Sequence, residues 1–106
     1  MDRPAPIRDQ ILGLIYDAID ELNGTLEADR RLDKTPDTQL FGENGRLDSF
    51  GLVTLIVGVE LRLGDSFEVP VTLADERAMS QRNSPFRSVG TLADYSVGLL
   101  QEAGRV

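Results

Sequence analysis

The chain contains no cysteine, no histidine and no tryptophan. Without cysteine it can form neither a disulfide nor a thiolate metal site, and it has no thiol nucleophile of its own. Without histidine it lacks the commonest general base and the commonest metal ligand. A small acidic chain of 106 residues with neither cysteine nor histidine is a poor candidate for a self-sufficient enzyme.

Long hydrophobic runs are also missing. No stretch approaches the roughly 18–20 apolar residues that cross a bilayer, so we expect no membrane insertion. The first ten residues, MDRPAPIRDQ, lack the apolar core of a signal peptide, which favours a cytoplasmic location. Hydrophobic residues make up 41% of the chain, enough for one modest core. We expect a monomer with a single domain over residues 7–103, preceded by a flexible segment at 1–6.

Positive charge is scarce, because 11 Lys and Arg residues face 18 Asp and Glu residues, for a net charge of -7. Binding to nucleic acid needs clustered basic residues, so we expect no nucleic-acid partner. The acidic balance favours proteins with basic docking surfaces, although a merely solvated acidic surface is the alternative. Four loop acids lack the alternating spacing of a calcium-binding EF-hand, and we expect no metal site. They are Asp33, Asp37, Glu43 and Asp48.

The spacing of apolar residues predicts an all-α fold. A first helix is expected over residues 7–23, with Gly24 as a left-handed cap. Its apolar face is formed by Ile7, Ile11, Ile15, Ala18 and Leu22. Residues 25–47 show no sustained period and predict a long connection with a short turn near 26–32. Its expected apolar anchors are Leu32, Leu40, Phe41 and Leu47.

A second helix is expected to begin at Asp48 or Ser49 and to run to about Leu63, closed by Gly64. It is apolar nearly all round, and its apolar residues fall into two stripes at 100° per residue. One stripe contains Leu52, Leu55, Ile56, Val59 and Leu63, and the other contains Phe50, Val53, Val57 and Leu61. Only one stripe can face the core of a small domain, so the other is expected to be exposed or to meet a partner.

The rest of the chain predicts one short and one longer helix. Phe67, Val69, Val71 and Leu73 alternate, but Pro70 and the lack of a second strand favour an extended loop that packs inward. Thr72 with Asp75 resembles a capping box for a short third helix over residues 73–81. After a polar break at 81–87, Ser88 is expected to cap a last helix that runs to Gly104. Its apolar face is Val89, Leu92, Ala93, Val97 and Leu100.

The chemistry of the chain points to residues 45–52, GRLDSFGL, where the long loop becomes the apolar helix. Ser49 is expected to lie exposed at a helix N-terminus, where backbone N–H groups and the helix dipole favour an anionic group. A phosphodiester on its hydroxyl would meet that field favourably. The alternative is that Asp48 or Ser49 is an ordinary helix cap.

The wider pattern resembles the acyl carrier protein family, whose members carry a phosphopantetheine arm. The resemblance rests on LFG at 40–42, on LDSFGLV at 47–53, on Glu60 and on LG at 63–64. It also includes the opening of the last helix, and it covers about residues 7–100. The family signature is Asp-Ser-Leu at the start of the second helix, and Phe50 here replaces the leucine. The resemblance implies a small bundle of three main helices and one short helix, with a long loop between the first two.

The resemblance also implies a function. A phosphopantetheinyl transferase would move 4′-phosphopantetheine from coenzyme A onto Ser49, and the new thiol would hold acyl groups as thioesters. Asp48 would orient the transferase and its metal site while capping the helix. The implied partner-docking positions are Phe50, Val53, Thr54, Val57, Glu60 and Leu61. The implied partners are the transferase, an acyl or aminoacyl ligase, and downstream acyl-transfer or condensing enzymes.

One departure from the family narrows this expectation. Carriers of fatty-acid synthesis usually line the second helix with acids, whereas Glu60 is the only acid in the predicted helix and Arg62 adds a positive charge. This favours a specialised biosynthetic pathway and docking by apolar contact. Residues 47–53 also resemble D-alanyl and other aminoacyl carriers, which remain an alternative. A second alternative is an unmodified helical interaction module that uses the same exposed stripe.

Overall fold

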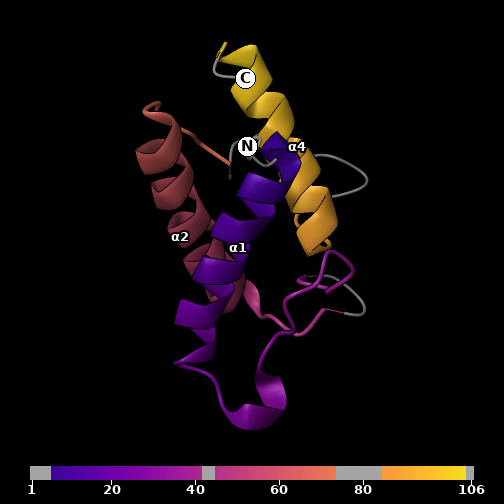
Figure 1. The fold of residues 1–106 in the computed structure, drawn as a ribbon. Helices are drawn as coiled ribbons and strands as arrows, with labels where there is room; N and C mark the ends of the chain where they lie inside the picture. The colour runs from indigo at the N-terminus through magenta and orange to yellow at the C-terminus, as the bar shows by residue number, and fades with distance from the viewer. Residues whose placement is uncertain (1–5, 42–44, 74–84, 105–106) are drawn as a thin grey trace, which may run out of the picture.

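The computed structural model describes residues 6–41, 45–73 and 85–104, and these residues form an all-α structure (Figure 1). Its elements are α1 (Ile7–Asn23), the 3₁₀ helix η1 (Ala28–Arg30), α2 (Ser49–Phe67) and α4 (Val89–Glu102). The described residues contain no β-strand, as expected from the sequence. The predicted all-α bundle is confirmed in this part of the chain.

Helix α1 has the bounds that its periodicity predicts, and it forms the centre of the bundle, where it contacts both α2 and α4. Its buried residues are Ile11, Leu12, Ile15, Ala18, Ile19 and Leu22. The prediction of a left-handed cap at Gly24 is wrong, because Gly24 has φ -63° and ψ -19°. The chain instead continues in right-handed turns, in which Thr25 N–H donates to the Leu22 carbonyl at 2.9 Å and Leu26 N–H donates to that of Asn23 at 3.1 Å.

The long connection contains η1, in the range where a short turn was predicted, and is anchored as expected by Leu32, Leu40 and Leu47, which are all buried. Phe41 was predicted to be a fourth anchor, and this is wrong because its side chain is 37% exposed. The chain is extended here, and Gln39 pairs with Ser88 in an antiparallel bridge. Successive side chains of an extended chain point to opposite sides, so burial of Leu40 turns Phe41 outward.

Three backbone hydrogen bonds tie this connection to the start of α4. Leu40 N–H donates to the Arg87 carbonyl at 2.8 Å, and Val89 N–H donates to that of Thr38 at 3.0 Å. Gly90 N–H donates to the carbonyl of Pro36 at 2.8 Å. A Cβ at Gly90 would lie 3.0 Å from that Pro36 oxygen, so glycine permits this close approach. The loop that leads to Ser49 is therefore held by the C-terminal part of the fold.

Helix α2 begins at Ser49 as predicted but ends at Phe67, a full turn beyond the predicted end. Gly64 lies inside the helix, where a Cβ would come within 3.3 Å of the Val69 carbonyl oxygen. Glycine at this position allows the chain that follows α2 to pass close to the helix. The left-handed cap is supplied by Glu68, with φ 55° and ψ 41°. Phe67 therefore belongs to the helix and not to the extended segment in which it was predicted.

The segment that follows α2 is extended, as the sequence predicts, and it packs inward. Leu73 is fully buried, and Val69 and Val71 are partly buried against the core. The predicted short helix over residues 73–81, with Asp75 in its capping box, falls almost wholly outside the described residues. Leu73 itself is not helical.

Helix α4 begins with the cap that the sequence predicts. The Ser88 hydroxyl accepts a hydrogen bond from Thr91 N–H at 3.2 Å, and the Thr91 hydroxyl accepts one from Ser88 N–H at 3.0 Å. Of the predicted apolar face, all but Val97 are buried. Ser96 is buried in addition, and its hydroxyl donates to the Leu92 carbonyl at 2.8 Å.

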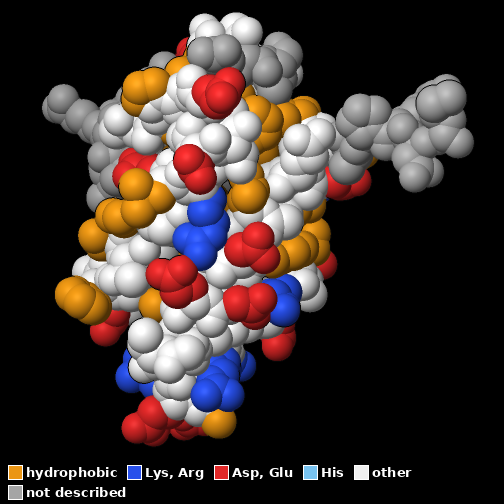
Figure 2. All heavy atoms as spheres, turned by 60° about the vertical axis from the view of Figure 1, so that its left-hand side comes forward, with side chains coloured by type: hydrophobic (Ala, Val, Ile, Leu, Met, Phe, Trp, Pro, Cys, Tyr) orange, Lys and Arg blue, Asp and Glu red, His pale blue; other side chains and the backbone are white. Residues whose placement is uncertain are grey.

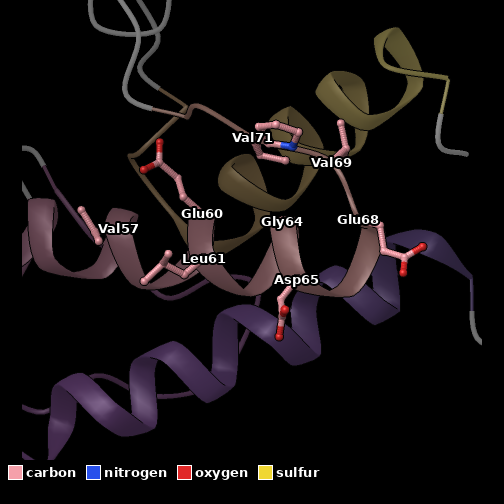
Figure 3. Close-up of a pocket in the computed structure, with 9 residues that line it drawn as sticks. Val57, Glu60, Leu61, Gly64, Asp65, Glu68, Val69 and Val71 are labelled. Carbon is pink, nitrogen blue, oxygen red and sulfur yellow. The ribbon is translucent and has the colours of Figure 1, made fainter.

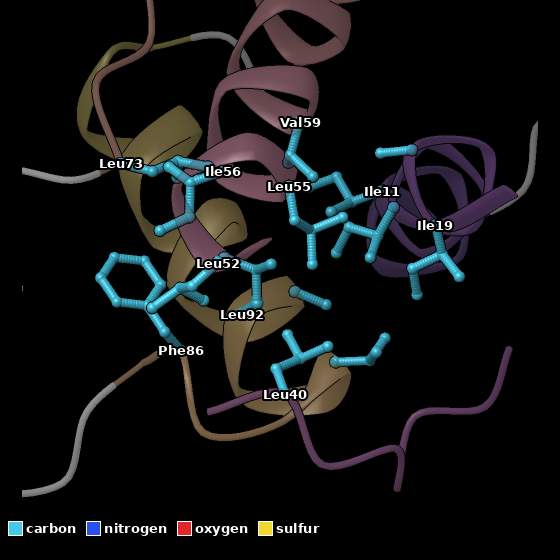
Figure 4. Close-up of a cluster of buried hydrophobic side chains, with 14 of the residues drawn as sticks. Ile11, Ile19, Leu40, Leu52, Leu55, Ile56, Val59, Leu73, Phe86 and Leu92 are labelled. Carbon is cyan, nitrogen blue, oxygen red and sulfur yellow. The ribbon is translucent and has the colours of Figure 1, made fainter. Parts of the chain in front are cut away.

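The core lies between α1, α2 and α4 (Figure 4). Phe86 is 1% exposed and packs in it, although it lies in the stretch that was predicted to be a polar break. Ion pairs join the helices at their edges, from Arg62 to Glu21 at 2.7 Å and from Arg8 to Asp94 at 2.8 Å. The hydrogen bond to Asp94 raises the pKa of the Arg8 guanidinium above its ordinary value.

Candidate functional site

Ser49 is the first residue of α2, and its side chain is exposed. Asp48 is the N-cap, and its carboxylate Oδ1 accepts a hydrogen bond from Gly51 N–H at 2.7 Å. Among the described residues, none forms a hydrogen bond with the Ser49 hydroxyl. Of the two residues predicted as possible caps, Asp48 is therefore the one that caps the helix, and the Ser49 side chain faces solvent.

Close packing fixes the turn that precedes Ser49. Leu47 is buried, and its N–H donates to the Leu40 carbonyl at 3.0 Å. A Cβ on Gly45 would lie 2.6 Å from the backbone of Leu40 and Phe41, so only glycine fits there without a shift. A Cβ on Gly51 would lie 3.2 Å from the Leu47 side chain. The chain is thus held in place on both sides of the serine.

The exposed stripe of α2, which consists of Phe50, Val53, Val57 and Leu61, starts directly after Ser49. These side chains are 83%, 57%, 46% and 69% exposed, respectively. The buried stripe, Leu52, Leu55, Ile56, Val59 and Leu63, is at most 5% exposed. Figure 2 shows hydrophobic side chains standing out from the surface on the α2 side of the molecule. The predicted division between a core face and a free face is confirmed, whereas docking on the free face stays a prediction.

The other two predicted docking residues differ from the exposed stripe. Thr54 is exposed, but its hydroxyl donates to the Phe50 carbonyl at 2.9 Å within the helix. Glu60 is half-buried, and its carboxylate accepts a hydrogen bond from Leu73 N–H at 2.5 Å. Glu60 thereby fixes the extended segment against α2, so at least part of its role is structural.

A groove of about 710 Å³ runs between the second half of α2 and this extended segment (Figure 3). Its apolar lining includes Val57, Leu61, Val69 and Val71, and its acids are Glu60, Asp65 and Glu68. We call it the acidic groove. It combines two of the exposed-stripe residues with three acidic residues, whose side chains point in different directions from α2 (Figure 3).

A second pocket, of about 420 Å³, lies between the end of α1, the loop after it and the first turns of α2. Its lining includes Leu22, Leu26, Leu47, Phe50, Arg30 and Arg46, and we call it the arginine pocket. This pocket was not predicted from the sequence. A signal was present, because Arg46 stands three residues before Ser49, but nothing in the spacing places Leu26 and Arg30 beside them.

Neither a membrane span nor a metal cluster is found in the part of the chain that the structure describes. None of its helices combines the length and the apolar character needed to cross a bilayer. No three His, Cys, Asp or Glu side chains are grouped there so as to hold a metal ion.

The geometry can be compared with that of known proteins. Comparison with protein-family models, with curated proteins and with solved structures finds no match to this chain. The case for a function therefore depends on the residues themselves.

Proposed function

We propose that this chain is an acyl carrier protein that holds acyl groups as thioesters on a 4′-phosphopantetheine arm attached to Ser49, in a specialised biosynthetic pathway. The observation that carries the proposal is the placement of Ser49. Its side chain is exposed at the first position of α2. The neighbouring Asp48 caps the helix, so the Ser49 hydroxyl is not used as the cap.

The residues around Ser49 fit such a group. The N-terminal end of a helix favours a phosphate through its free N–H groups and its dipole. When bound, the arm supplies the thiol that a chain without cysteine lacks. The closely packed turn at 45–48 and the buried stripe hold the attachment point on the fold, so that an attached group would extend from a defined position.

A separate transferase would catalyse the attachment, since the chain has no histidine and no described side chain forms a hydrogen bond with the Ser49 hydroxyl to activate it. The Ser49 oxygen forms a bond to the phosphorus of the phosphopantetheine part of coenzyme A. The bond from that phosphorus to adenosine 3′,5′-bisphosphate breaks, and the serine proton passes to a base on the transferase. The exposed stripe lies next to the reacting hydroxyl and offers the transferase, the ligase and the condensing enzymes an apolar surface.

Intact mass measures the modification directly. Incubation of the protein with coenzyme A and a broad-specificity phosphopantetheinyl transferase should add about 340 Da, the mass of one phosphopantetheine group. The matched control is Ser49→Ala, which should gain nothing while it keeps the helical spectrum of the wild type. No gain in the wild type, under conditions that fully convert a reference carrier, would refute the proposal. That result would favour the alternative function, an unmodified helical interaction module that binds partners through the exposed stripe.

The aminoacyl carrier remains the alternative for the cargo, on the resemblance of residues 47–53. Incubation of the modified protein with candidate adenylating enzymes, ATP and either fatty acids or amino acids, followed by intact mass, separates the two cargo classes.

A further inference from the structure

The arginine pocket opens beside the attachment point. Asp48 and Phe50 both line it, and Ser49 lies between them in the chain. Its volume of about 420 Å³ is within the roughly 300–1,000 Å³ range of small-molecule sites. A group attached to Ser49 therefore begins at the rim of a pocket that is large enough to hold it.

The charges of this pocket are unusual for a chain of net charge -7. The ion pairs of the described residues involve Arg8, Lys34 and Arg62, so neither Arg30 nor Arg46 pairs with a described carboxylate. One Nη of Arg46 donates to the Asp29 carbonyl at 3.1 Å, which leaves its other N–H groups to a ligand. Figure 2 shows several basic side chains, with acidic ones beside them, towards the lower end of the molecule, the end where Figure 1 places η1.

The two hollows beside α2 therefore differ in charge. The acidic groove carries Glu60, Asp65 and Glu68, which would repel a phosphodiester. Its lining begins at Val57, eight residues and about 12 Å along the helix from Ser49. The arginine pocket is adjacent to the serine and has two arginines against one carboxylate, that of Asp48. Its balance of charge favours an anion, because guanidinium groups form charge-assisted hydrogen bonds with phosphate oxygens.

We propose that the phosphopantetheine arm, once attached to Ser49, lies in the arginine pocket, with its phosphodiester paired to Arg30 and Arg46. The inference rests on the proposed function. The dimethyl part of the arm packs against Leu22 and Leu26, since these supply apolar lining. The hydroxyls of Thr25 and Thr54 donate to the carbonyls of Leu22 and Phe50, and their oxygens remain able to accept from the amide N–H groups of the arm.

The arm would carry the only thiol of the protein, because the chain has no cysteine. A maleimide nitroxide therefore labels the tip of the arm alone, and its effect on the amide signals of the ¹⁵N-labelled protein reports where the arm lies. The signals of Leu26 and Thr54 should broaden several-fold more than those of Val69 and Val71 in the acidic groove. Equal broadening, or stronger broadening at Val69 and Val71, would overturn the proposal.

Charge-neutralising variants test the role of the arginines. In the double variant Arg30→Gln with Arg46→Gln, the nitroxide should broaden the amide signals of the arginine pocket and of the acidic groove to the same extent. The matched control Arg87→Gln removes an exposed arginine that does not line the pocket, and it should keep the difference. A pattern unchanged in the double variant would show that the arginines do not hold the arm.

Two other causes of a negative result can be told apart from a wrong placement of the arm: a disturbed loop and an arm that was never attached. Arg46 also binds the Asp29 carbonyl, so its loss could disturb the loop. The single variant Arg30→Gln removes a side chain with no hydrogen bond to a described residue, and it should reduce the difference with the unlabelled spectrum unchanged. If no label is taken up, the arm is absent and the carrier function itself is refuted. If label is taken up without the predicted pattern, only the placement of the arm is wrong.

Discussion

Helix α2 carries two stripes of similar side chains that differ in what covers them. The buried stripe packs against α1 and the rest of the core, whereas the exposed stripe faces solvent along much of the same helix. Leu55 is 1% exposed and Leu61 is 69% exposed, although they lie six residues apart and have identical chemistry. Apolar character alone therefore does not tell a folding residue from a recognition residue; the rotational position on the helix does.

The largest expected effect comes from the matched pair of these leucines. Leu55→Ala removes buried methyl groups and should lower the free energy of unfolding by about 2–5 kcal/mol. Leu61→Ala removes the same atoms from solvent and should change it by no more than about 0.5 kcal/mol. Urea denaturation measures both. Similar losses for the two variants would show that the exposed stripe supports the fold, which would contradict the comparison.

A charge placed on the exposed stripe should separate recognition from folding. Val57 is 46% exposed, so Val57→Asp should leave the melting temperature nearly unchanged. It should slow transfer of phosphopantetheine to Ser49 on the order of tenfold, since a charge in the apolar centre of an interface is costly. Gln101→Asp on α4 adds the same charge at an exposed position elsewhere and should leave the rate unaltered. A collapse of the melting temperature in Val57→Asp would instead place Val57 in the core.

The smallest expected effect concerns the helix start, from which both stripes begin. Asp48→Ala removes the acceptor of the Gly51 N–H group and should destabilise the protein by about 1 kcal/mol. Asp48→Asn retains a capping oxygen and should keep most of that stability. If Asp48→Asn nevertheless slows modification of Ser49, then the carboxylate charge serves the transferase beyond its capping role. Equal rates for Asp48→Asn and the wild type would assign Asp48 to capping alone.

Regular helical periodicity was the most reliable guide to this fold. The bounds of α1, the start of α2, the two stripes and the Ser88 cap all follow from local patterns, because helical spacing and capping depend on near neighbours. The end of α2 was missed, because Gly64 serves a contact with the returning chain that its own neighbourhood does not reveal.

Tertiary contacts account for the other differences. Phe86 is buried although polar residues surround it in the sequence, and Phe41 is exposed because pairing between residues 39 and 88 turns it outward. The position of Ser49 could be predicted from its motif. The pocket beside it could not, since Leu26, Arg30 and Arg46 converge only when the loop folds back on α2.

The hydrogen bonds from residues 36–40 to residues 87–90 have a consequence for synthesis of the chain. A nascent chain that ends before Arg87 lacks all three bonds, so the loop that holds the start of α2 is without its backbone ties to the C-terminal part of the fold. The native surroundings of Ser49 should therefore form only after the beginning of α4 has left the ribosome. An enzyme that recognises that folded surface would then modify chains with a nearly complete core and pass over truncated ones.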